Sequence, residues 1–395
     1  MSNPSLSARP GLALYAKFVV LAVFILIFAG GLVTSWGAGM AAPDWPVTFG
    51  SLNPAGWWDN FPLRLEHGHR LIATYIGFLT AFLAAAVWRH RILMVVIGAL
   101  AAIHALYLLF GTPDPASPAT GSTGWHGLVA GAVILAVGAI FALLLAFTSP
   151  AAGREERVIR VLALCALIGV CLQATLGGIR VTSQTAGDAN LALTLRILHG
   201  CVAQAYLCVV VALATLLSPR WNSRQEHETV ASGLRKLGWI TAGVIYVQLI
   251  FGAAMRHVGA GLAIATFPAA NPDGSFMPKV HNLPTDLNFT HTRFGAITVT
   301  FFVLLFAIST LRSARGNSRL LRPASALLAL LLVQLTLGVL VVLHTKPPTL
   351  TTFHVLNGAA LLATALLLTL RLGRFSSETE PLPLSGAKLH TEALA

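Results

Sequence analysis

The chain has 395 residues, of which 56% are hydrophobic and only 10% are charged, and its mean hydropathy is +0.76. Soluble domains normally carry about 25% charged residues, so this composition excludes a soluble globular protein and indicates an integral membrane protein. The net charge of +12 does not indicate binding to nucleic acid, because the basic residues lie in short loops between apolar runs. Four cysteines within apolar stretches fit neither a zinc motif nor a CxxC redox pair, and are expected to be packing residues. They are Cys165, Cys171, Cys201 and Cys208.

Ten segments are long and apolar enough to cross a bilayer, which takes about 20 apolar residues. They lie at residues 15–37, 67–87, 92–111, 125–147, 158–179, 194–217, 237–256, 288–311, 321–343 and 351–370. The third is the weakest, because His104 interrupts it and Gly111–Pro113 ends it. The first is too long for the core of a signal peptide, and no Arg- and Ser-rich presequence precedes it. We therefore expect an all-α polytopic protein of a bacterial or archaeal plasma membrane.

The basic residues of the loops predict the orientation. One side of the membrane receives 18 of the 26 lysines and arginines, and the other side receives 8. Because positive residues accumulate on the cytoplasmic side, we expect both termini in the cytoplasm. Several of the eight outer basic residues lie within motifs at helix ends, so they need an explanation of their own.

An internal repeat relates the two halves of the chain. Gly37–Ala41, which leads to Trp45-Pro46, recurs as Gly259–Ala263, which leads to Phe267-Pro268, an offset of 222 positions. Three further pairs keep this offset without a gap: Pro62 and Pro284, Leu65 and Leu287, and His69 and His291. A register preserved over such a distance indicates two related structural units.

A second motif shows where the first unit is longer. Gln173-x-x-Leu176-Gly177 recurs as Gln334-x-x-Leu337-Gly338 at an offset of only 161. The first half therefore holds 61 additional residues, which the third and fourth spans fill. Two inserted spans preserve sidedness, so the halves are parallel repeats. We expect two four-helix bundles, at residues 1–220 and 221–375, with an inserted two-helix hairpin at about 90–155 and a flexible cytoplasmic tail at 376–395.

Four histidines occupy corresponding positions in the two units. His69 and His291 open the second helix of each unit, and His199 and His354 open the fourth. All four are expected near the outer membrane face, where two histidines from different helices could supply both axial ligands of a heme iron. Ionisable groups within spans are costly and usually functional. The alternative is that they are interfacial histidines at wetted helix ends.

Three arginines and one carboxylate accompany these histidines. Arg70, Arg196 and Arg293 are candidate partners for heme propionates, although they could instead extend to lipid headgroups. Glu66 lies three residues before His69, so the two side chains share a helix face, and Asn288 stands at the matching place in the second unit. A carboxylate can stabilise positive charge or accept a proton, whereas an amide cannot. We expect the first site to perform chemistry, unless Glu66 merely suits the helix dipole.

Together these residues resemble the heme A synthase family over most of the chain except about residues 90–155 and the tails. The motifs that carry the resemblance are Gly31-Leu32-Val33-Thr34-Ser35, Asp44-Trp45-Pro46, Glu66-His67-Gly68-His69-Arg70, Gln173-Ala174-Thr175-Leu176-Gly177-Gly178 followed by His199, His291-Thr292-Arg293, and Gln334 to Gly338 followed by His354. The Glu-x-x-His-Arg element alone is weak, and the ordered set of four histidines with glutamines and glycines is specific.

The resemblance implies an oxidoreductase that converts the C8 methyl of heme O to a formyl group, through hydroxymethyl, and so makes heme A for terminal oxidases. In that reading His69 and His199 flank the substrate heme, Glu66 is catalytic, and His291 and His354 ligate a permanent heme b. Heme O and heme A are the implied partners, with heme O synthase and oxidase assembly factors as further candidates beside membrane lipids. No nucleic-acid partner is expected.

Two departures from the family pattern stand out. Some bacterial members carry a cysteine pair in the first outer loop, and none is present between Met40 and Ser51. The inserted hairpin is unusual, and its His104 and His126 are interpreted as structural, lipid-facing or partner-facing. His257 aligns with Ser35 and is expected near the rim of the second heme. The remaining histidines receive no role, and they are His67, His90, His227, His281, His344 and His390.

Two other functions stay open. A diheme b-type electron carrier without chemistry on its heme would explain the four histidines equally well, and the difference between Glu66 and Asn288 argues only modestly against it. A secondary transporter is also built from repeats. Transporters, however, place broken helices and polar groups near mid-membrane, and here the polar groups gather at one face.

Overall fold

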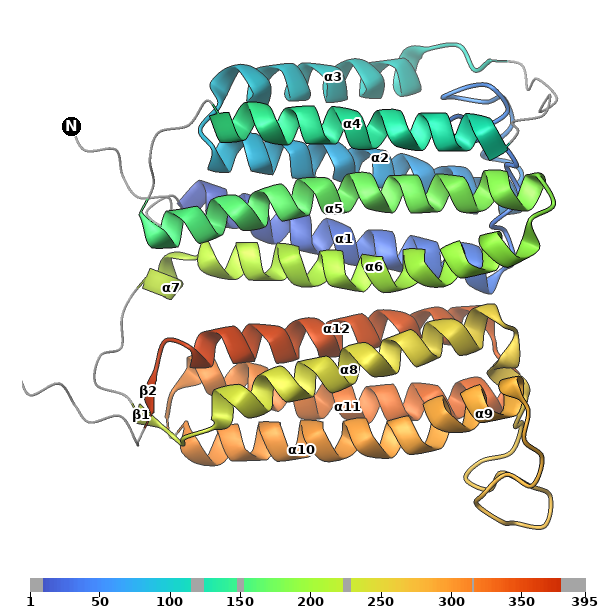
Figure 1. The fold of residues 1–395 in the computed structure, drawn as a ribbon, viewed down its shortest axis with the longest axis vertical. Coiled ribbons are helices and arrows are strands. Elements are labelled where there is room, and N and C mark those ends of the chain that lie inside the picture. Colours follow the sequence, from blue (N-terminus) through green and yellow to red (C-terminus); the bar gives the residue numbers. More distant parts are fainter. Residues whose placement is uncertain (1–9, 115–123, 148–152, 223–228, 315, 378–395) are drawn as a thin grey trace, which may run out of the picture.

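Ten long apolar helices run side by side in the computed structural model, which describes residues 10–114, 124–147, 153–222, 229–314 and 316–377 (Figure 1). In these ranges ten helical segments are long and apolar enough to cross a membrane, which confirms the expected all-α polytopic class. Of the tail predicted at residues 376–395, the part after Ser377 lies outside the described residues.

The first half contains six of these helices and a short seventh. They are α1 (Pro10–Ser35), α2 (Phe61–Val87), α3 (Arg91–Phe110), α4 (Gly124–Phe147), α5 (Arg154–Thr185), α6 (Ala189–Leu216) and the short α7 (Pro219–Asn222). The second half contains α8 (Leu234–His257), the 3₁₀ turn η2 (Ala260–Leu262), α9 (Leu283–Phe289), the π-helical turn η3 (Thr290–Gly295), α10 (Ala296–Ser313), α11 (Ser318–Leu343) and α12 (Pro348–Leu372). Two-residue strands, β1 (Thr229–Val230) and β2 (Ser376–Ser377), pair in parallel.

The repeat is visible in how the helices begin. The side chain of Asn60 caps α2 by accepting a hydrogen bond from the Leu63 backbone N–H, and Asn282 caps α9 in the same way through Thr285. A proline stands in the first turn of both helices, where its missing N–H is not needed. The loops before these helices, residues 36–60 and 258–282, each contain one cis X-Pro bond, at Trp45-Pro46 and Phe267-Pro268.

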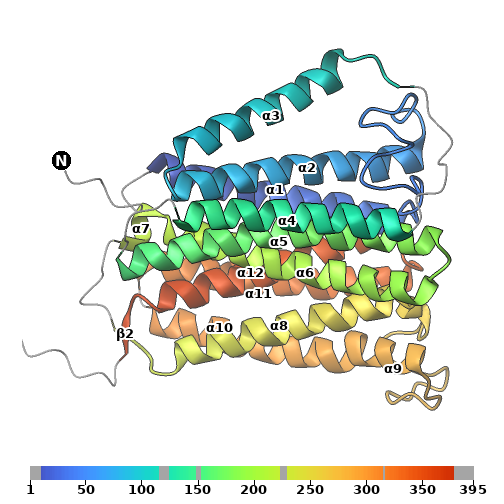
Figure 2. The same cartoon turned by 45° about the horizontal axis from the view of Figure 1, so that its top comes forward.

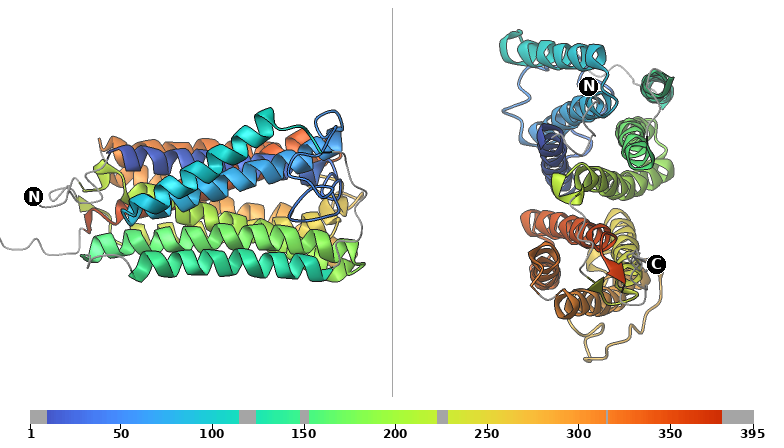
Figure 3. Two further views of the ribbon diagram at one scale, coloured as in Figure 1. Left: turned by 90° about the horizontal axis from the view of Figure 1, so that it is seen from above. Right: turned by 90° about the vertical axis from the view of Figure 1, so that its left-hand side faces the viewer.

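Each half forms a four-helix bundle. In the first, α1 and α5 each pack against both α2 and α6, so α2 and α6 face each other across the centre (Figure 3). In the second, α8 and α11 each pack against both α10 and α12, so α10 and α12 are opposed in the same way. The expectation of two related bundles therefore corresponds to how the helices pack.

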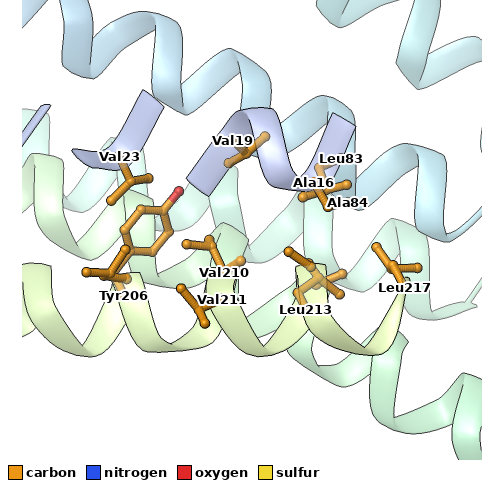
Figure 4. Packing of buried hydrophobic residues seen from close by; sticks show 14 of the residues in the cluster. Ala16, Val19, Val23, Leu83, Ala84, Tyr206, Val210, Val211, Leu213 and Leu217 are labelled. Carbon is orange, nitrogen blue, oxygen red and sulfur yellow. The ribbon is translucent and has the colours of Figure 1, made fainter. Parts of the chain in front are cut away.

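The two bundles meet through α1 and α6 on one side and α8 and α12 on the other. Ala359, Ala363 and Leu366 of α12 belong to the apolar core of the first bundle. In that core, side chains of α1 such as Val19 and Val23 pack against Tyr206 and Val210 of α6 (Figure 4). Small residues at this junction let the helix backbones approach closely, which is how helices commonly associate in lipid.

The inserted helices do not form a hairpin packed on itself. α3 packs on α2 and α4 packs on α5, outside two neighbouring helices of the first bundle (Figures 2 and 3). α4 lies close to α5 because Gly127, Gly131 and Gly138 contact α5, and a Cβ at any of them would overlap its side chains. The expected hairpin is thus two separate helices that widen the first bundle.

Candidate functional site

The four histidines lie at the same end of the two bundles, the end that carries loops 36–60 and 258–282 (Figure 1). At a rise of about 1.5 Å per residue, each lies roughly 9–15 Å from the first residue of its helix. The sequence placed these histidines at the openings of their helices. The helices begin about one to two turns earlier than expected, so the imidazoles lie within the bundles.

The members of each pair come from helices that oppose each other across a bundle. His69 of α2 is opposed by His199 of α6, and His291 of η3 is opposed by His354 of α12. The ring centres of His291 and His354 are 6.3 Å apart, and their planes are inclined at 81°. His69 and His199 are near enough to interact electrostatically. The structure therefore brings the sequence-predicted histidines together in the expected pairs.

Each imidazole packs against a glycine of the preceding helix in its bundle. A Cβ on Gly30 would lie 3.0 Å from Cε1 of His69, and one on Gly177 would lie 3.0 Å from Cε1 of His199. In the second unit the corresponding distances are 2.7 Å from Gly252 to His291 and 3.2 Å from Gly338 to His354. These four glycines obey the repeat offsets of 222 and 161. Glycine at these positions leaves room for the ring beside the helix backbone.

Glutamines position three of the four histidine segments. Gln173 donates from Nε2 to the His199 carbonyl, and Gln248 donates to the His291 carbonyl. Gln334 lies 3.2 Å from Nε2 of His354 and accepts a hydrogen bond from Asn357. Gln173 and Gln334 were part of the predicted motif, whereas Gln248 has no counterpart in the first unit, where Leu26 stands at the matching position.

The residues present fit an iron porphyrin in each bundle. Nδ1 of all four histidines is buried without a hydrogen-bond partner, an arrangement that normally requires a ligand or compensation. Two imidazoles that bind one metal atom from opposite sides, with bonds of about 2 Å, have ring centres about 6 Å apart. In the described part of the chain no three His, Cys, Asp or Glu side chains gather as a metal site. Paired histidines suit a metal that a macrocycle already holds.

The Glu66 carboxylate is buried and held by three groups. Its Oε1 accepts a 2.8 Å hydrogen bond from Nη2 of Arg70 and lies 4.0 Å from Nη2 of Arg180, and its Oε2 accepts from the Ala41 backbone N–H at 3.0 Å. Its side chain is only 2% exposed. The position therefore holds a fixed negative charge on the helix turn before His69.

Arg70 and Arg293 both hold the loop that covers their unit. Arg70 donates to the carbonyls of Asp44, Val47 and Ala42. Arg293 donates to the carbonyls of Thr266 and Ala269, which match Asp44 and Val47, and also to that of Pro268. Nearly all N–H groups of both guanidinium groups are engaged in this way. These contacts engage both arginines with the loops, and their role as propionate partners stays a prediction.

The π-helical turn explains a break in the repeat. Arg70 directly follows His69, but Arg293 stands two residues after His291. A π turn accommodates one additional residue within a helix, and η3 spans this segment. The additional residue allows both His291 and Arg293 to occupy the places of His69 and Arg70.

Polar groups of the first unit are replaced by neutral ones in the second. Asn288 takes the place of Glu66 and donates to the Ala260 carbonyl. Asp44, whose Oδ2 accepts from the Gly50 N–H, corresponds to Thr266. His67, whose Nδ1 lies 3.0 Å from Oγ1 of Thr48, corresponds to Phe289. The two units thus share their histidines and glycines and differ in the ionisable groups beside them.

Three further arginines lie around the first pair, and of these only Arg196 was predicted from the sequence as a propionate partner. Arg180 donates to the Gly39 carbonyl, and Arg196 makes only a weak bond within its own helix. Arg256, from the second unit, donates from Nη2 to the Gly31 carbonyl and to Oγ of Ser35. His257 lies within electrostatic range of Arg196, Arg180 and His199. His257 was expected at the second heme, and the structure instead turns it toward the first unit.

The other polar residues singled out in the sequence have local roles. The ring of His104 lies 5.5 Å from that of Tyr75 and 6.3 Å from that of Phe78, in agreement with a structural role. His90 caps α3 by accepting from the Leu93 N–H. Lys279 pairs with Asp273 and so lowers the pKa of that carboxyl. His227 and His390 lie outside the described residues.

Comparison with known proteins agrees with this arrangement. The model of the family COX15-CtaA, described as cytochrome oxidase assembly protein, matches residues 124–366, well over half of the chain. A heme A synthase of Shouchella clausii is 25% identical over 352 residues, 88% of this chain and 92% of that protein. A heme A synthase of a Bradyrhizobium species is 25% identical over 369 residues, 88% of this chain and 87% of that protein. Heme A synthase COX15 of Homo sapiens is 29% identical over 223 residues, 52% of this chain and 53% of that protein. The chain therefore belongs to the heme A synthase family of cytochrome oxidase assembly proteins.

Proposed function

We propose that this protein is a heme A synthase that oxidises the C8 methyl of heme O, through a hydroxymethyl, to the formyl group of heme A. The observation that carries the proposal is the contrast between two otherwise matched histidine pairs. Only the first has a buried carboxylate, Glu66, one helical turn away, and the second has the amide of Asn288 there. A difference confined to ionisable groups is expected where only one of two similar sites performs a reaction.

In the first site the two histidines would hold heme O, and Glu66 would supply a negative charge beside it. His69 and His199 would ligate the iron of heme O from opposite sides, and the glycines behind them fix their rings. Oxidation of the methyl carbon withdraws electrons and develops positive charge beside the porphyrin ring. The Glu66 carboxylate, fixed by Arg70 and Ala41, would stabilise that charge electrostatically without having to reorganise.

In the second site His291 and His354 would ligate a permanent heme b. When bound there, this heme would supply one-electron redox chemistry. The 6.3 Å separation of the two rings supports this assignment. The contact of α12 and α8 with the first bundle would keep the two sites at a fixed separation.

Porphyrin analysis after expression beside a source of heme O tests the proposal. We expect purified protein to contain heme b, and the extracts to contain hydroxylated and formylated derivatives of heme O. We expect Glu66→Gln to retain bound heme and to lower product formation by at least tenfold. The matched control is Glu156→Gln, because Glu156 forms the same i,i+4 pair with Arg160, also at 2.8 Å, at the other end of the molecule. That control should leave product formation unchanged.

The other outcomes identify the alternatives. Bound heme b without any modified heme O would indicate a diheme electron carrier, and a protein without heme would favour a transporter. Full heme A production by Glu66→Gln would remove the carboxylate from the mechanism. His291→Ala should abolish the bis-histidine heme b spectrum, and a spectrum unchanged by that substitution would contradict the assignment of the second site.

A further inference from the structure

Beside the first histidine pair, the described residues place four arginines and one carboxylate in contact with them. Arg70, Arg180, Arg196 and Arg256 gather there, and the carboxylate that contacts them is Glu66, which Arg70 already engages at 2.8 Å. The charges of Arg180 and Arg196 act on each other and on His257. Cations withdrawn from water are costly unless an anion compensates them. The excess therefore points to an anionic ligand.

Two of these arginines lie one helical turn from the level of the His199 imidazole, both toward the turn that joins α5 to α6. Arg180 follows, by one turn of α5, the Gly177 that contacts the His199 ring. Arg196 precedes His199 by one turn of α6, so the two side chains share a face. Nη1 of Arg180 is fixed on the Gly39 carbonyl, and its Nη2 lies 4.0 Å from Glu66. A group bound at His199 would thus meet both guanidinium groups.

The third arginine comes from the other bundle. Arg256 is next to the end of α8, which packs against α6, and its Nη2 reaches the Gly31 carbonyl and Oγ of Ser35 on α1. Gly31 follows Gly30, whose backbone contacts the His69 ring. Ser35 Oγ is in turn 3.0 Å from Oγ1 of Thr352 on α12. These contacts fix Arg256 at the junction of the bundles, where its charge also acts on His354 of the second pair.

The second histidine pair also has cations near it, because the charge of Arg256 acts on His354 and Lys346 lies against Gly261 as Arg180 lies against the repeat-related Gly39. Arg180 corresponds to Val341 at the offset of 161, and Arg196 corresponds to Thr351 at the offset of 155 that relates His199 to His354. Arg293 is engaged by the loop carbonyls of its own unit. Arg196 is therefore the cation of the first site that has no cationic counterpart in the second.

We propose that Arg180, Arg196 and Arg256 bind the propionate carboxylates of the porphyrin in the first site, which a residue of the second unit thereby completes. This inference rests on the proposed function and specifies how that site recognises its substrate. Arginine suits the task because its planar guanidinium forms paired, charge-assisted hydrogen bonds to a carboxylate. Charge recognition would orient the porphyrin, while the permanent heme of the second site would depend on its histidines and apolar walls.

Titration of the full-length protein with two porphyrins tests the inference. Purified protein that retains its second-site heme is titrated with ferric protoporphyrin IX heme and with the dimethyl ester of the same heme, which lacks the negative charges. We expect the ester to bind the first site at least tenfold more weakly, because each lost charged hydrogen bond contributes roughly tenfold in affinity. Equal binding of heme and ester would overturn the proposal, and this comparison needs no variant.

Variants then assign the residues. Arg180→Gln, Arg196→Gln and Arg256→Gln should each weaken binding of heme by roughly tenfold and leave binding of the ester nearly unchanged. Arg256→Lys should restore part of the affinity. Arg64→Gln is the control, since exposed Arg64 donates to the Trp58 carbonyl at the same end. The second-site spectrum reports correct folding in each case. An Arg256→Gln protein with that spectrum intact and unaltered first-site affinity would exclude Arg256.

A negative result here is distinguishable from failure of the proposed function. If wild-type protein makes heme A but binds heme and its ester equally, the synthase assignment stands and the propionate site is wrong. If heme binds more tightly than its ester but no modified heme O forms, the propionate site stands and the synthase assignment is wrong.

Discussion

At the scale of single residues, the four glycines behind the histidines are as informative as the histidines themselves. Each imidazole presents Cε1 to the backbone of a glycine on the preceding helix, so a methyl group at that position must displace the ring. Tight packing makes such an insertion costly, typically about 1–3 kcal/mol. The displacement would also move the coordinating nitrogen, since the ring moves as a rigid body.

Gly252→Ala is therefore expected to disturb the second site. The added Cβ would lie 2.7 Å from Cε1 of His291, so we expect weaker heme retention and an altered bis-histidine spectrum after purification. Gly243→Ala is the matched control, because Gly243 is on the same helix and has no neighbour within 4 Å of a built Cβ. Equal heme content and identical spectra in the two variants would show that the glycine contact does not position His291.

Sequence reasoning at this scale found the ligands but not their surroundings. The histidines and two glutamines recur at fixed offsets, so a single sequence is enough to identify them as candidate site residues. The partners of Arg70 and Arg293 are backbone carbonyls of loops, and any sequence can supply a carbonyl. The approach of Arg256 to α1 depends on how two bundles pack, which no local pattern encodes. The shared glycine offsets were available in the sequence and could have identified the glycines.

At the scale of elements, the π-helical turn η3 reconciles two repeats that differ by one residue. In the first unit, histidine and arginine are adjacent, and in the second, Thr292 separates them. The π turn absorbs this residue, so the helix before it and the helix after it keep the faces they have in the first unit. The sequence expectation of a helix at 288–311 was confirmed, but periodicity alone does not show where a helix widens.

Deletion of Thr292 should consequently be tolerated. The deletion would place arginine directly after His291, as in the first unit, and return the turn to α-helical geometry. We expect the variant to be produced and to retain the heme b spectrum of the second site. Deletion of Thr298, in the regular helix α10, should abolish that spectrum, because it rotates Val303 and Phe306 out of the core. Loss of the spectrum in both deletions would contradict this account of η3.

The inserted elements show the limit of span prediction. Hydropathy located α3 and α4 correctly, and their adjacency in sequence suggested a hairpin. The helices pack instead on α2 and α5, because small residues of α4 match Thr175 and Thr182 of α5. Helix pairing in lipid follows the fit of such surfaces rather than apolarity, since lipid is as apolar as the helices.

At the scale of the whole molecule, two bundles of one design have diverged in their charges. The offset of 222 predicted two parallel units, and the opposed helices of each bundle carry its histidines in the same way. The junction between the units could not be read from the repeat, because Arg256 corresponds to Thr34 and has no cationic equivalent. In the proposed propionate site, that asymmetry would let the second unit contribute to the first site, which a pair of independent bundles could not do.

Sidedness is a property of the whole chain and yields the last prediction. Cysteines introduced as Asp59→Cys, in the loop before α2, and Ser232→Cys, before α8, lie at opposite ends of the molecule (Figure 1). In a background with alanine at the four native cysteines, a membrane-impermeant thiol reagent should label Asp59→Cys in intact spheroplasts. Ser232→Cys should react only after lysis, because its end carries the excess of lysine and arginine. The reverse pattern would place both histidine pairs at the cytoplasmic face, so that heme would be modified and released on the inner side.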